Sequence, residues 1–307
     1  MAPKKRSSPG KTRLTISLSN TTLRKVDQAI DGQQLRNRSH AIESLLERSL
    51  KPQISTAVIL AGGPATAPIG DRGRSTGPSP ASTPKPLTVL DDKPLIIYTL
   101  EHLKRHQVTK VIIATGATGH QLQDAVGGGE RLGLSIEYEY EAEPLGTAGA
   151  LRSLKKRLTD QPFFVLAGDV LTTIDLTELA EFHFQYRGLV TMAVKPRVTQ
   201  ASYDNVYIQG NRVIDFQAST ADQSVGIINA GVYVFEPAAL ELIPDKTPAM
   251  LEKDFFPQVS KQHRLLGYPF QGIWFDIGSE SNYRQALARL HRDRRDRKKR
   301  AAGKTVK

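Results

Sequence analysis

The chain has 307 residues, with 42 Lys and Arg against 31 Asp and Glu, a formal charge of +11 and no Cys. At about 100 to 200 residues per domain, this length predicts one large or two smaller domains with room for a hydrophobic core. Without Cys, disulfides, thiolate metal sites and Cys nucleophiles are excluded, so any catalysis has to use oxygen and nitrogen groups. No apolar run approaches the roughly 18 residues of a spanning helix and no secretory signal is recognisable, so we expect a cytoplasmic protein.

The positive charge is concentrated at the two ends of the chain. Residues 1–51 and residues 291–307 each carry a net charge of +7, while residues 52–290 carry −3. Such asymmetry favours a polyanion as partner, although a basic tail alone is more often a solvated flexible end. The parts that we expect are a disordered leader (1–11), a small domain (12–51), a large domain (54–290) and a basic tail (291–307).

Residues 12–51 predict the order strand, helix, helix. Polar and apolar residues alternate over 13–18, which is typical of a strand with one apolar face. Asn20 or Thr21 is expected to cap the first helix and Gly32 to end it, and Ser39 is expected to cap the second helix. A unit of this size cannot close a core or pair the backbone of a lone strand, so we expect a homodimer with a two-stranded ribbon.

This layout, with Asn37-Arg38-Ser39 opening the second helix, resembles the ribbon-helix-helix family of DNA-binding proteins. The resemblance implies that double-stranded DNA is a partner, with the ribbon in the major groove and a phosphate at the second helix. It also implies a nucleoid-associated location within the cytoplasm. The alternative is a dimerisation element that contacts no nucleic acid. The residues implied for DNA contact are Arg13, Thr15, Ser17, Arg36, Arg38 and Ser39.

Apolar runs of strand type alternate with amphipathic helical patterns along residues 54–290. This alternation predicts an α/β domain with a Rossmann-like, doubly wound mixed sheet. In such sheets ligands bind beyond the carboxyl ends of the strands, so the loops after the strands are where chemistry is expected. The strands are expected at 56–60, 111–114, 163–166 and 190–194, and the helices at 95–106, 146–158 and 176–186.

Short segments in these loops resemble the sugar-1-phosphate nucleotidyltransferases, the family of nucleotide-sugar pyrophosphorylases. They occur in the family's order over about 230 residues, which makes the combination specific although each alone is weak. The resemblance implies attack of a sugar phosphate on the α-phosphorus of a nucleoside triphosphate, with Mg²⁺ and no organic cofactor. The segments are Leu60-Ala61-Gly62-Gly63, Pro84-Lys85-Pro86-Leu87, residues 143–149, Gly168-Asp169, residues 229–233, residues 252–257 and residues 274–278.

The resemblance also implies roles for individual residues at the matching positions. Lys85 and Asp169 are the implied catalytic residues, with Lys85 at the phosphate oxygens, and Asp169 and Asp276 are the implied Mg²⁺ ligands. The alternatives are a tight turn at Asp169 and a helix cap at Asp276, near Ser279. The residues implied for binding the nucleotide and the sugar are Leu60, Gly62, Gly63, Gly146, Thr147 and Asn229.

Two positively charged residues of the family pattern are absent. In the family's G-G-x-G-T-R-L segment, Ala65 replaces a glycine and Ala67 replaces the arginine. Further along, residues 217–219 replace a segment whose lysine holds the sugar phosphate. Each such contact is worth roughly 2 to 4 kcal/mol in a transition state, so their loss predicts a rate lower by about 10³ or more. Arg72 and Arg74 are candidate replacements for the missing arginine.

These features lead to one main interpretation and two alternatives. The main one is a DNA-binding regulator whose nucleotidyltransferase-like domain binds a nucleotide or nucleotide sugar, with impaired catalysis. The first alternative is an active sugar-1-phosphate nucleotidyltransferase that the basic ends assemble or tether. The second is a nonspecific nucleoid-associated scaffold with an inert body, which would bind DNA with a steep salt dependence and no sequence preference.

Overall fold

The computed structural model describes residues 15–30, 35–50, 53–63, 83–117, 119–198, 205–217 and 225–304. The chain divides into two compact units, residues 1–51 and residues 52–307. In the described ranges, no helix combines the length and the apolar character needed to cross a membrane.

The first unit contains two helices, α1 (Asn20–Ala29) and α2 (Arg38–Leu50). The two helices agree with the predicted order, but residues 15–18 have no regular structure. An isolated strand leaves its backbone groups without partners, so the predicted ribbon would need a second chain. Arg13, which is predicted to contact DNA, and Gly32, which is predicted to end α1, lie outside the described residues.

Both helices begin slightly earlier than the sequence predicted. The Ser19 side chain caps α1 by accepting a hydrogen bond from the amide of Thr22, at 3.1 Å. The Asn37 side chain caps α2 by accepting one from the amide of His40, at 2.9 Å. Ser39 lies inside α2 and is not its cap, since short polar residues occur at both positions and the helix begins at the first of them.

An ion pair joins the two helices of this unit. The Arg38 guanidinium contacts both carboxylate oxygens of Asp27, at 2.7 and 2.9 Å. The hydrogen bond from Arg38 lowers the pKa of Asp27. Arg38, predicted to contact DNA, is therefore paired within its own unit.

A nine-stranded mixed sheet forms the centre of the second unit, with the order β5-β4-β1-β6-β11-β8-β12-β10-β9. The first four strands in this order are parallel, whereas β11 is antiparallel to both of its neighbours, β6 and β8. The bounds are β1 (Thr56–Ala61), β4 (Lys110–Thr115), β5 (Ser135–Tyr140), β6 (Phe163–Ala167), β8 (Val190–Val198), β9 (Asn205–Gln209), β10 (Arg212–Gln217), β11 (Val225–Phe235) and β12 (Leu265–Pro269).

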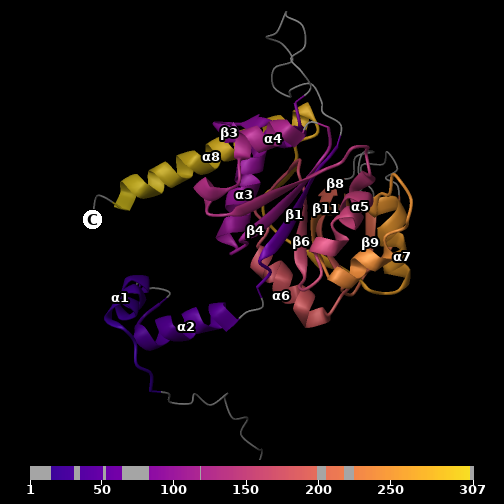
Figure 1. Ribbon diagram of the computed structural model, residues 1–307. Helices are drawn as coiled ribbons and strands as arrows, with labels where there is room; N and C mark the ends of the chain where they lie inside the picture. The colour runs from indigo at the N-terminus through magenta and orange to yellow at the C-terminus, as the bar shows by residue number, and fades with distance from the viewer. Residues whose placement is uncertain are drawn as a thin grey trace, which may run out of the picture. The chain divides into compact units, whose positions relative to one another are not determined.

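Helices cover both faces of this sheet (Figure 1). Because side chains alternate along a strand, Ile59 of β1 packs into one apolar cluster and Val58 into another. The first cluster includes residues of α3 (Leu95–Arg105), α4 (Gly119–Val126) and α6 (Leu176–Tyr186), and the second includes residues of α5 (Gly146–Ser153) and α7 (Phe256–Lys261). This arrangement confirms the predicted α/β fold.

Two short ladders lie outside the main sheet. One pairs β2 (Val89–Leu90) with β3 (Lys93–Pro94), and the other pairs β7 (Val170–Thr172) with β13 (Trp274–Asp276). The remaining turns of helix are the 3₁₀ segments Lys85–Leu87, Glu130–Leu132, Lys155–Arg157 and Pro237–Leu242 and a π-helical turn over Leu251–Phe255.

The C-terminal helix α8 (Glu280–Lys304) includes most of the predicted basic tail. Near the middle of α8, Arg294 contacts Asp91 at 2.6 Å and Asp92 at 2.7 Å, at the turn between β2 and β3. This part of the tail therefore docks on the second unit.

Candidate active site

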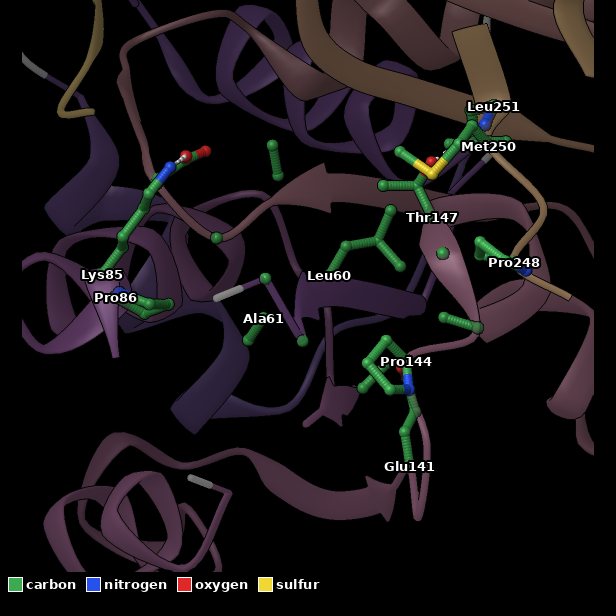
Figure 2. A pocket seen from close by; sticks show the side chains of 18 of the residues that line it. Leu60, Ala61, Lys85, Pro86, Glu141, Pro144, Thr147, Pro248, Met250 and Leu251 are labelled. Carbon is green, nitrogen blue, oxygen red and sulfur yellow. Dashed lines mark hydrogen bonds and ion pairs between the residues drawn. The ribbon is translucent and has the colours of Figure 1, made fainter. Parts of the chain in front are cut away.

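A cavity of about 360 Å³ opens at the carboxyl ends of β1 and β6. The 3₁₀ segment at Lys85, the start of α5 and residues 248–252 complete its wall (Figure 2). This position is the one that the doubly wound topology predicts for a ligand. Seven of the predicted site residues line the cavity, namely Leu60, Gly62, Gly63, Lys85, Gly146, Thr147 and Asp169.

A second cavity of about 300 Å³ adjoins the first. Asn229, Trp274 and Asp276 line the second cavity, while Asp169 and Glu252 line both. The two predicted site residues that the first cavity lacks, Asn229 and Asp276, are therefore found here. Asp169 therefore lies at the boundary between the two cavities.

Lys85, Asp169 and Asp276 form a charged group at this boundary. The Lys85 ammonium lies 3.0 Å from a carboxylate oxygen of Asp169. The β7–β13 ladder places Asp276 opposite Val170, the neighbour of Asp169. Burial lowers the pKa of Lys85, but the charges of Asp169 and Asp276 outweigh it, so the pKa is raised. Lys85 is thus held as a cation, the form that binds phosphate.

The alternative role of Asp169 was a tight turn, and that of Asp276 was a helix cap; the structure shows the turn but not the cap. Asp169 does occupy a turn, between β6 and β7, so the turn and the site occur together. Asp276 accepts a hydrogen bond from the amide of Gly278 at 2.7 Å, while Ser279 caps α8 by accepting the amide of Asn282 at 3.2 Å. Asp276 is therefore not the cap of that helix.

Carboxylate oxygens at the cavity boundary suit a magnesium ion. Within the described ranges, no group of three or more His, Cys, Asp or Glu residues could form a complete metal site. Mg²⁺ commonly binds through one or two carboxylates and takes its other ligands from phosphates and water. The pair Asp169 and Asp276 fits that pattern, whereas it would not fit a structural zinc site.

The start of α5 is fixed against the segment before the π-helical turn. The Thr147 hydroxyl accepts a hydrogen bond from the amide of Leu251 at 2.9 Å. Gly146 has φ of +79°, and a Cβ atom there would lie 2.4 Å from the carbonyl oxygen of Ala249. Thr147 therefore shapes the cavity wall, and only glycine fits the position before it without strain.

Asn229 shapes the second cavity through a bulge in β11. Its side-chain amide donates to the Tyr233 hydroxyl at 2.8 Å and its oxygen accepts from the amide of Gly231 at 3.0 Å. The register of β11 against β8 shifts between Asn229 and Tyr233. Both ends of the side-chain amide thus hold the bulge, whose residues help to line the second cavity.

Glu141 lines the first cavity and was not predicted. It follows β5, and its carboxylate accepts a hydrogen bond from the amide of Leu145 at 3.0 Å. A Cβ atom on Gly62 would lie 3.1 Å from its other carboxylate oxygen, so the glycine permits this close approach. Burial raises the pKa of Glu141. The predicted segment began two residues later, and only the parallel pairing of β4 and β5 brings Glu141 to the cavity.

Two cations on β8, Arg197 and Lys195, were also not predicted. The Arg197 guanidinium lies 5.2 Å from the ring centre of Trp274 and donates to Asn282 at 2.9 Å. Lys195, on the same face of β8, donates to the carbonyl of Gly272 at 2.8 Å. Burial and the charge of Arg197 lower the pKa of Lys195. Arg197 thus brings a positive charge to the face of Trp274, which lines the second cavity.

Comparisons with known proteins agree with this site. The sequence profile of the nucleotidyl transferase family matches residues 56–293. The chain therefore belongs to the nucleotidyl transferase family.

Among its relatives is the D-glycero-alpha-D-manno-heptose 1-phosphate guanylyltransferase of Aneurinibacillus thermoaerophilus. The two are 32% identical over 234 residues, which is 76% of this chain and 97% of the relative. The catalytic subunit beta of mannose-1-phosphate guanylyltransferase from Danio rerio is 33% identical over 220 residues, which is 70% of this chain. The chain spans only 61% of the length of that second relative.

Solved structures share the fold. The crystal structure of HddC from Yersinia pseudotuberculosis complexed with GMP-PN has a TM-score of 0.64 and 24% identity, and the match covers 77% of this chain and 100% of HddC. A putative glucose-1-phosphate thymidylyltransferase from Bacillus anthracis has a TM-score of 0.65 and 20% identity, and the match covers 76% of this chain and 94% of that one.

The interpretation as a DNA-binding regulator with impaired catalysis is wrong. Relatives that match the second unit are named as guanylyltransferases, which favours the alternative of an active enzyme. Impaired catalysis was expected because two cations are missing at particular positions in the sequence. Arg197, on β8, lies against Trp274, which lines the second cavity, and was not among the predicted residues.

Proposed function

We propose that the second unit is an active sugar-1-phosphate guanylyltransferase. It would convert GTP and a hexose or heptose 1-phosphate of the manno type to the GDP-sugar and pyrophosphate. The observation that carries this proposal is the meeting of Lys85, Asp169 and Asp276 at the boundary between two adjoining cavities. The names of the relatives support guanine as the base and a manno sugar as the acceptor.

The reaction needs positioning rather than a covalent intermediate. An oxygen of the sugar phosphate forms a bond to the α-phosphorus, and the bond from that phosphorus to the bridging oxygen breaks, so pyrophosphate leaves with the electron pair. The nucleotide would occupy the first cavity and the sugar phosphate the second, which aligns the attacking and leaving oxygens. Lys85 would neutralise negative charge that builds up on the phosphoryl oxygens between them.

Asp169 and Asp276 would hold Mg²⁺, which, when bound, supplies charge neutralisation and orientation of the phosphates. The two carboxylates have a second effect on the chain itself. They keep Lys85 protonated, because they raise its pKa. The carboxylates and the ammonium thus set the charge at the reacting centre together.

Lys195 and Arg197 would supply the positive charge on the sugar side. Arg197 covers the face of Trp274, which lines the second cavity. A guanidinium held against a ring and by Asn282 loses little conformational entropy when an anion binds. We propose that this pair attracts the sugar phosphate, which removes the reason to expect slow turnover.

The direct test is pyrophosphate release by the purified chain. We expect release with GTP and mannose 1-phosphate or the manno-heptose 1-phosphate in the presence of Mg²⁺, and its loss when EDTA removes the metal. Each nucleoside triphosphate should be tested with each sugar phosphate, so that a different pairing is detected. The absence of turnover with every pairing would overturn the proposal.

The first unit is proposed to form a homodimer. Ile16, Leu18, Leu45 and Leu46 are apolar and exposed in the single chain. Four exposed apolar side chains on so small a unit favour burial against a second copy. Contact with DNA through Thr15, Ser17, Arg36 or Ser39 stays a prediction, and Arg38 would first have to leave Asp27.

A further inference from the structure

A third apolar cluster of the second unit has a member close in sequence to each of the three charged residues at the cavity boundary. Leu171, on β7, is two residues beyond Asp169, and Ile277 directly follows Asp276. The Ile277 amide also donates to the carbonyl of Asp169 at 2.8 Å. A shift of this cluster would therefore move both carboxylates. Its buried members are Leu90, Leu95, Leu171, Ile277 and Ala286.

The same cluster is connected to Lys85 through the β2–β3 ladder. Lys85 begins the 3₁₀ segment that precedes β2, and Leu90, at the end of β2, is in the cluster. The Thr88 amide donates to the Lys85 carbonyl at 3.0 Å. The Tyr98 hydroxyl, on α3, donates to the Leu90 carbonyl at 2.9 Å. Because the chain between Lys85 and Leu90 is short and hydrogen-bonded, a shift of the ladder would move the Lys85 ammonium.

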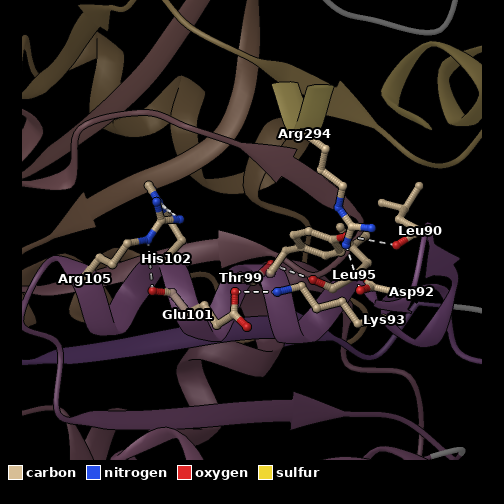
Figure 3. Close-up of polar contacts among 10 residues, drawn as sticks. Leu90, Asp92, Lys93, Leu95, Thr99, Glu101, His102, Arg105 and Arg294 are labelled. Carbon is tan, nitrogen blue, oxygen red and sulfur yellow. Dashed lines mark hydrogen bonds and ion pairs between the residues drawn. The ribbon is translucent and has the colours of Figure 1, made fainter. Parts of the chain in front are cut away.

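Helix α8 packs on this cluster and contacts the ladder at two places. Ala286 is in the cluster, and the Tyr283 hydroxyl donates to the carbonyl of Val89 on β2 at 3.1 Å. Further along α8, Arg294 reaches the turn between β2 and β3, where Figure 3 shows it beside Asp92. The helix that follows Asp276 in sequence is therefore attached to the ladder that follows Lys85.

The turn that Arg294 contacts has a strained backbone. Asp91 has φ of +63°, in the left-handed region that residues other than glycine seldom adopt. Its side chain is only 15% exposed, and the His291 imidazole and the Arg294 guanidinium each contact one of its carboxylate oxygens, at 3.2 and 2.6 Å. A strained turn persists where its surroundings hold it, so we attribute the shape of this turn to the two side chains of α8.

We propose that Arg294 is a positioning residue for the reaction, because its contact with the β2–β3 turn determines where Lys85 lies relative to the two carboxylates. The inference rests on the proposed function, since it assumes that this charged group meets the reacting phosphates. Among the described side chains, none from α8 lines either cavity. Arg294 therefore acts through the ladder and the cluster and touches no substrate.

The experiment measures kcat and both KM values of full-length Arg294→Gln with GTP and the accepted sugar phosphate. A misplacement of about 1 Å at a reacting centre can cost a factor of about 10², so we expect a smaller shift to lower kcat about tenfold. Each KM should stay within about twofold of the wild type, because the cavity walls are unchanged. Arg294→Lys keeps the charge but lacks the planar fork, so its kcat should be only about threefold below the wild type.

Arg289→Gln is the matched control. Arg289 lies on the same helix but pairs with Asp293 within α8, at 3.1 Å, and its substitution should leave kcat as in the wild type. Amide hydrogen exchange at residues 87–93 gives a readout that does not depend on turnover. Exchange there should be faster in Arg294→Gln than in the wild type and in Arg289→Gln, because the ladder loses a contact that keeps it closed.

A wild-type kcat or unchanged exchange in Arg294→Gln would overturn the inference and leave the enzyme assignment intact. Equal losses of kcat in Arg294→Gln and Arg289→Gln would also overturn it, because they would indicate a general effect of charge on α8. The same holds for a rise in either KM as large as the fall in kcat, which would indicate an effect on substrate binding. A wild type that turns over no pairing of substrates would contradict the proposed function and the inference together.

Discussion

Asp169 takes part in two interactions that depend on the charge of its carboxylate. It pairs with Lys85 and is a proposed Mg²⁺ ligand. Asp169→Asn keeps the size of the side chain but removes its charge, so we expect turnover to fall by about 10² to 10³. Pyrophosphate release measures the effect, with the exposed Asp160→Asn as control. Wild-type turnover in Asp169→Asn would show that the metal is held elsewhere.

Arg197 should affect the sugar phosphate more than the nucleotide, because it packs on Trp274 beside the second cavity. We expect Arg197→Gln to raise KM for the sugar phosphate about tenfold, the effect of losing one charged contact, with KM for GTP nearly unchanged. The exposed Arg212→Gln, on β10, controls for the loss of one positive charge. Equal changes in both KM values would indicate a general structural effect instead.

At this scale the sequence predicted residues that lie in recognisable segments, such as Lys85 and Asp276. It did not predict Glu141 or Arg197, because their relevance depends on which strands are neighbours. The parallel pairing of β4 with β5 places Glu141, and the pairing of β8 with β11 places Arg197. Such pairings join residues far apart in sequence and follow from packing of the whole sheet.

At the scale of elements, the start of α5 depends on Gly146. An alanine there would need φ of +79° and would bring its Cβ within 2.4 Å of the Ala249 carbonyl oxygen. We expect Gly146→Ala to lower the free energy of unfolding by about 1 to 3 kcal/mol and to reduce GTP binding.

Gly210→Ala is the control that separates the effect of backbone strain from the effect of the steric clash at Gly146. Gly210 also has a positive φ, but no atom lies within 4 Å of the added Cβ. We expect a loss of about 1 kcal/mol there and unchanged GTP binding. Urea unfolding measures the free energy of unfolding, and calorimetry measures GTP binding. A smaller loss in Gly146→Ala than in Gly210→Ala would contradict the proposed close contact.

Helix α3 carries a buried histidine that makes stability depend on pH. Figure 3 shows His102 beside Arg105 on this helix. Burial, together with the charges of the neighbouring His106 and Arg105, lowers the pKa of His102 from 6.5 to about 4. The folded chain thus keeps His102 neutral where the unfolded chain binds a proton, so stability is lost as the pH falls from about 6.5 to 4.

At pH 5 this loss amounts to about 2 kcal/mol relative to pH 7.5. We expect His102→Gln to reduce the difference in unfolding free energy between these two pH values by about that amount. The exposed His120→Gln should leave the difference as in the wild type. Urea unfolding at both pH values provides the measurement, and an unchanged pH dependence in His102→Gln would contradict the argument.

The periodicity of apolar residues predicted the helices and strands of the second unit better than those of the first unit. The expected helix at residues 176–186 matches α6, and the expected strand at 56–60 is one residue shorter than β1. Both are long enough for their apolar pattern to be distinctive, and both are buried in one large core. The expected strand at 13–18 has no such core, and its described part, residues 15–18, is irregular.

At the scale of the whole molecule, some of the basic residues near the two ends of the chain form ion pairs within their own unit. Arg38 pairs with Asp27 inside the first unit, and Arg294 pairs with Asp91 and Asp92 inside the second. Part of the positive charge therefore stabilises local structure. Net charge along the chain predicted a polyanion partner because it counts every basic residue as available, whereas tertiary contacts use some of them.

The assembly state of the whole chain tests the role of the first unit. Ile16 and Leu46 are about half exposed, at 47% and 50%, and among the described side chains of this unit only Val26 and Ala41 are buried. If a second copy covers them, a charge at each position must be desolvated on association and should prevent it. We expect light scattering to give twice the chain mass for the wild type and a single chain for Ile16→Glu with Leu46→Glu.

Thr21→Glu with Gln28→Glu adds the same two charges at exposed polar positions of α1 and should remain a dimer. Turnover per chain should be similar in all three proteins, because every residue of the proposed active site lies in the second unit. A monomeric wild type, or a dimeric Ile16→Glu with Leu46→Glu variant, would contradict dimerisation through these side chains. Loss of turnover in the monomer alone would instead show that the active site depends on assembly.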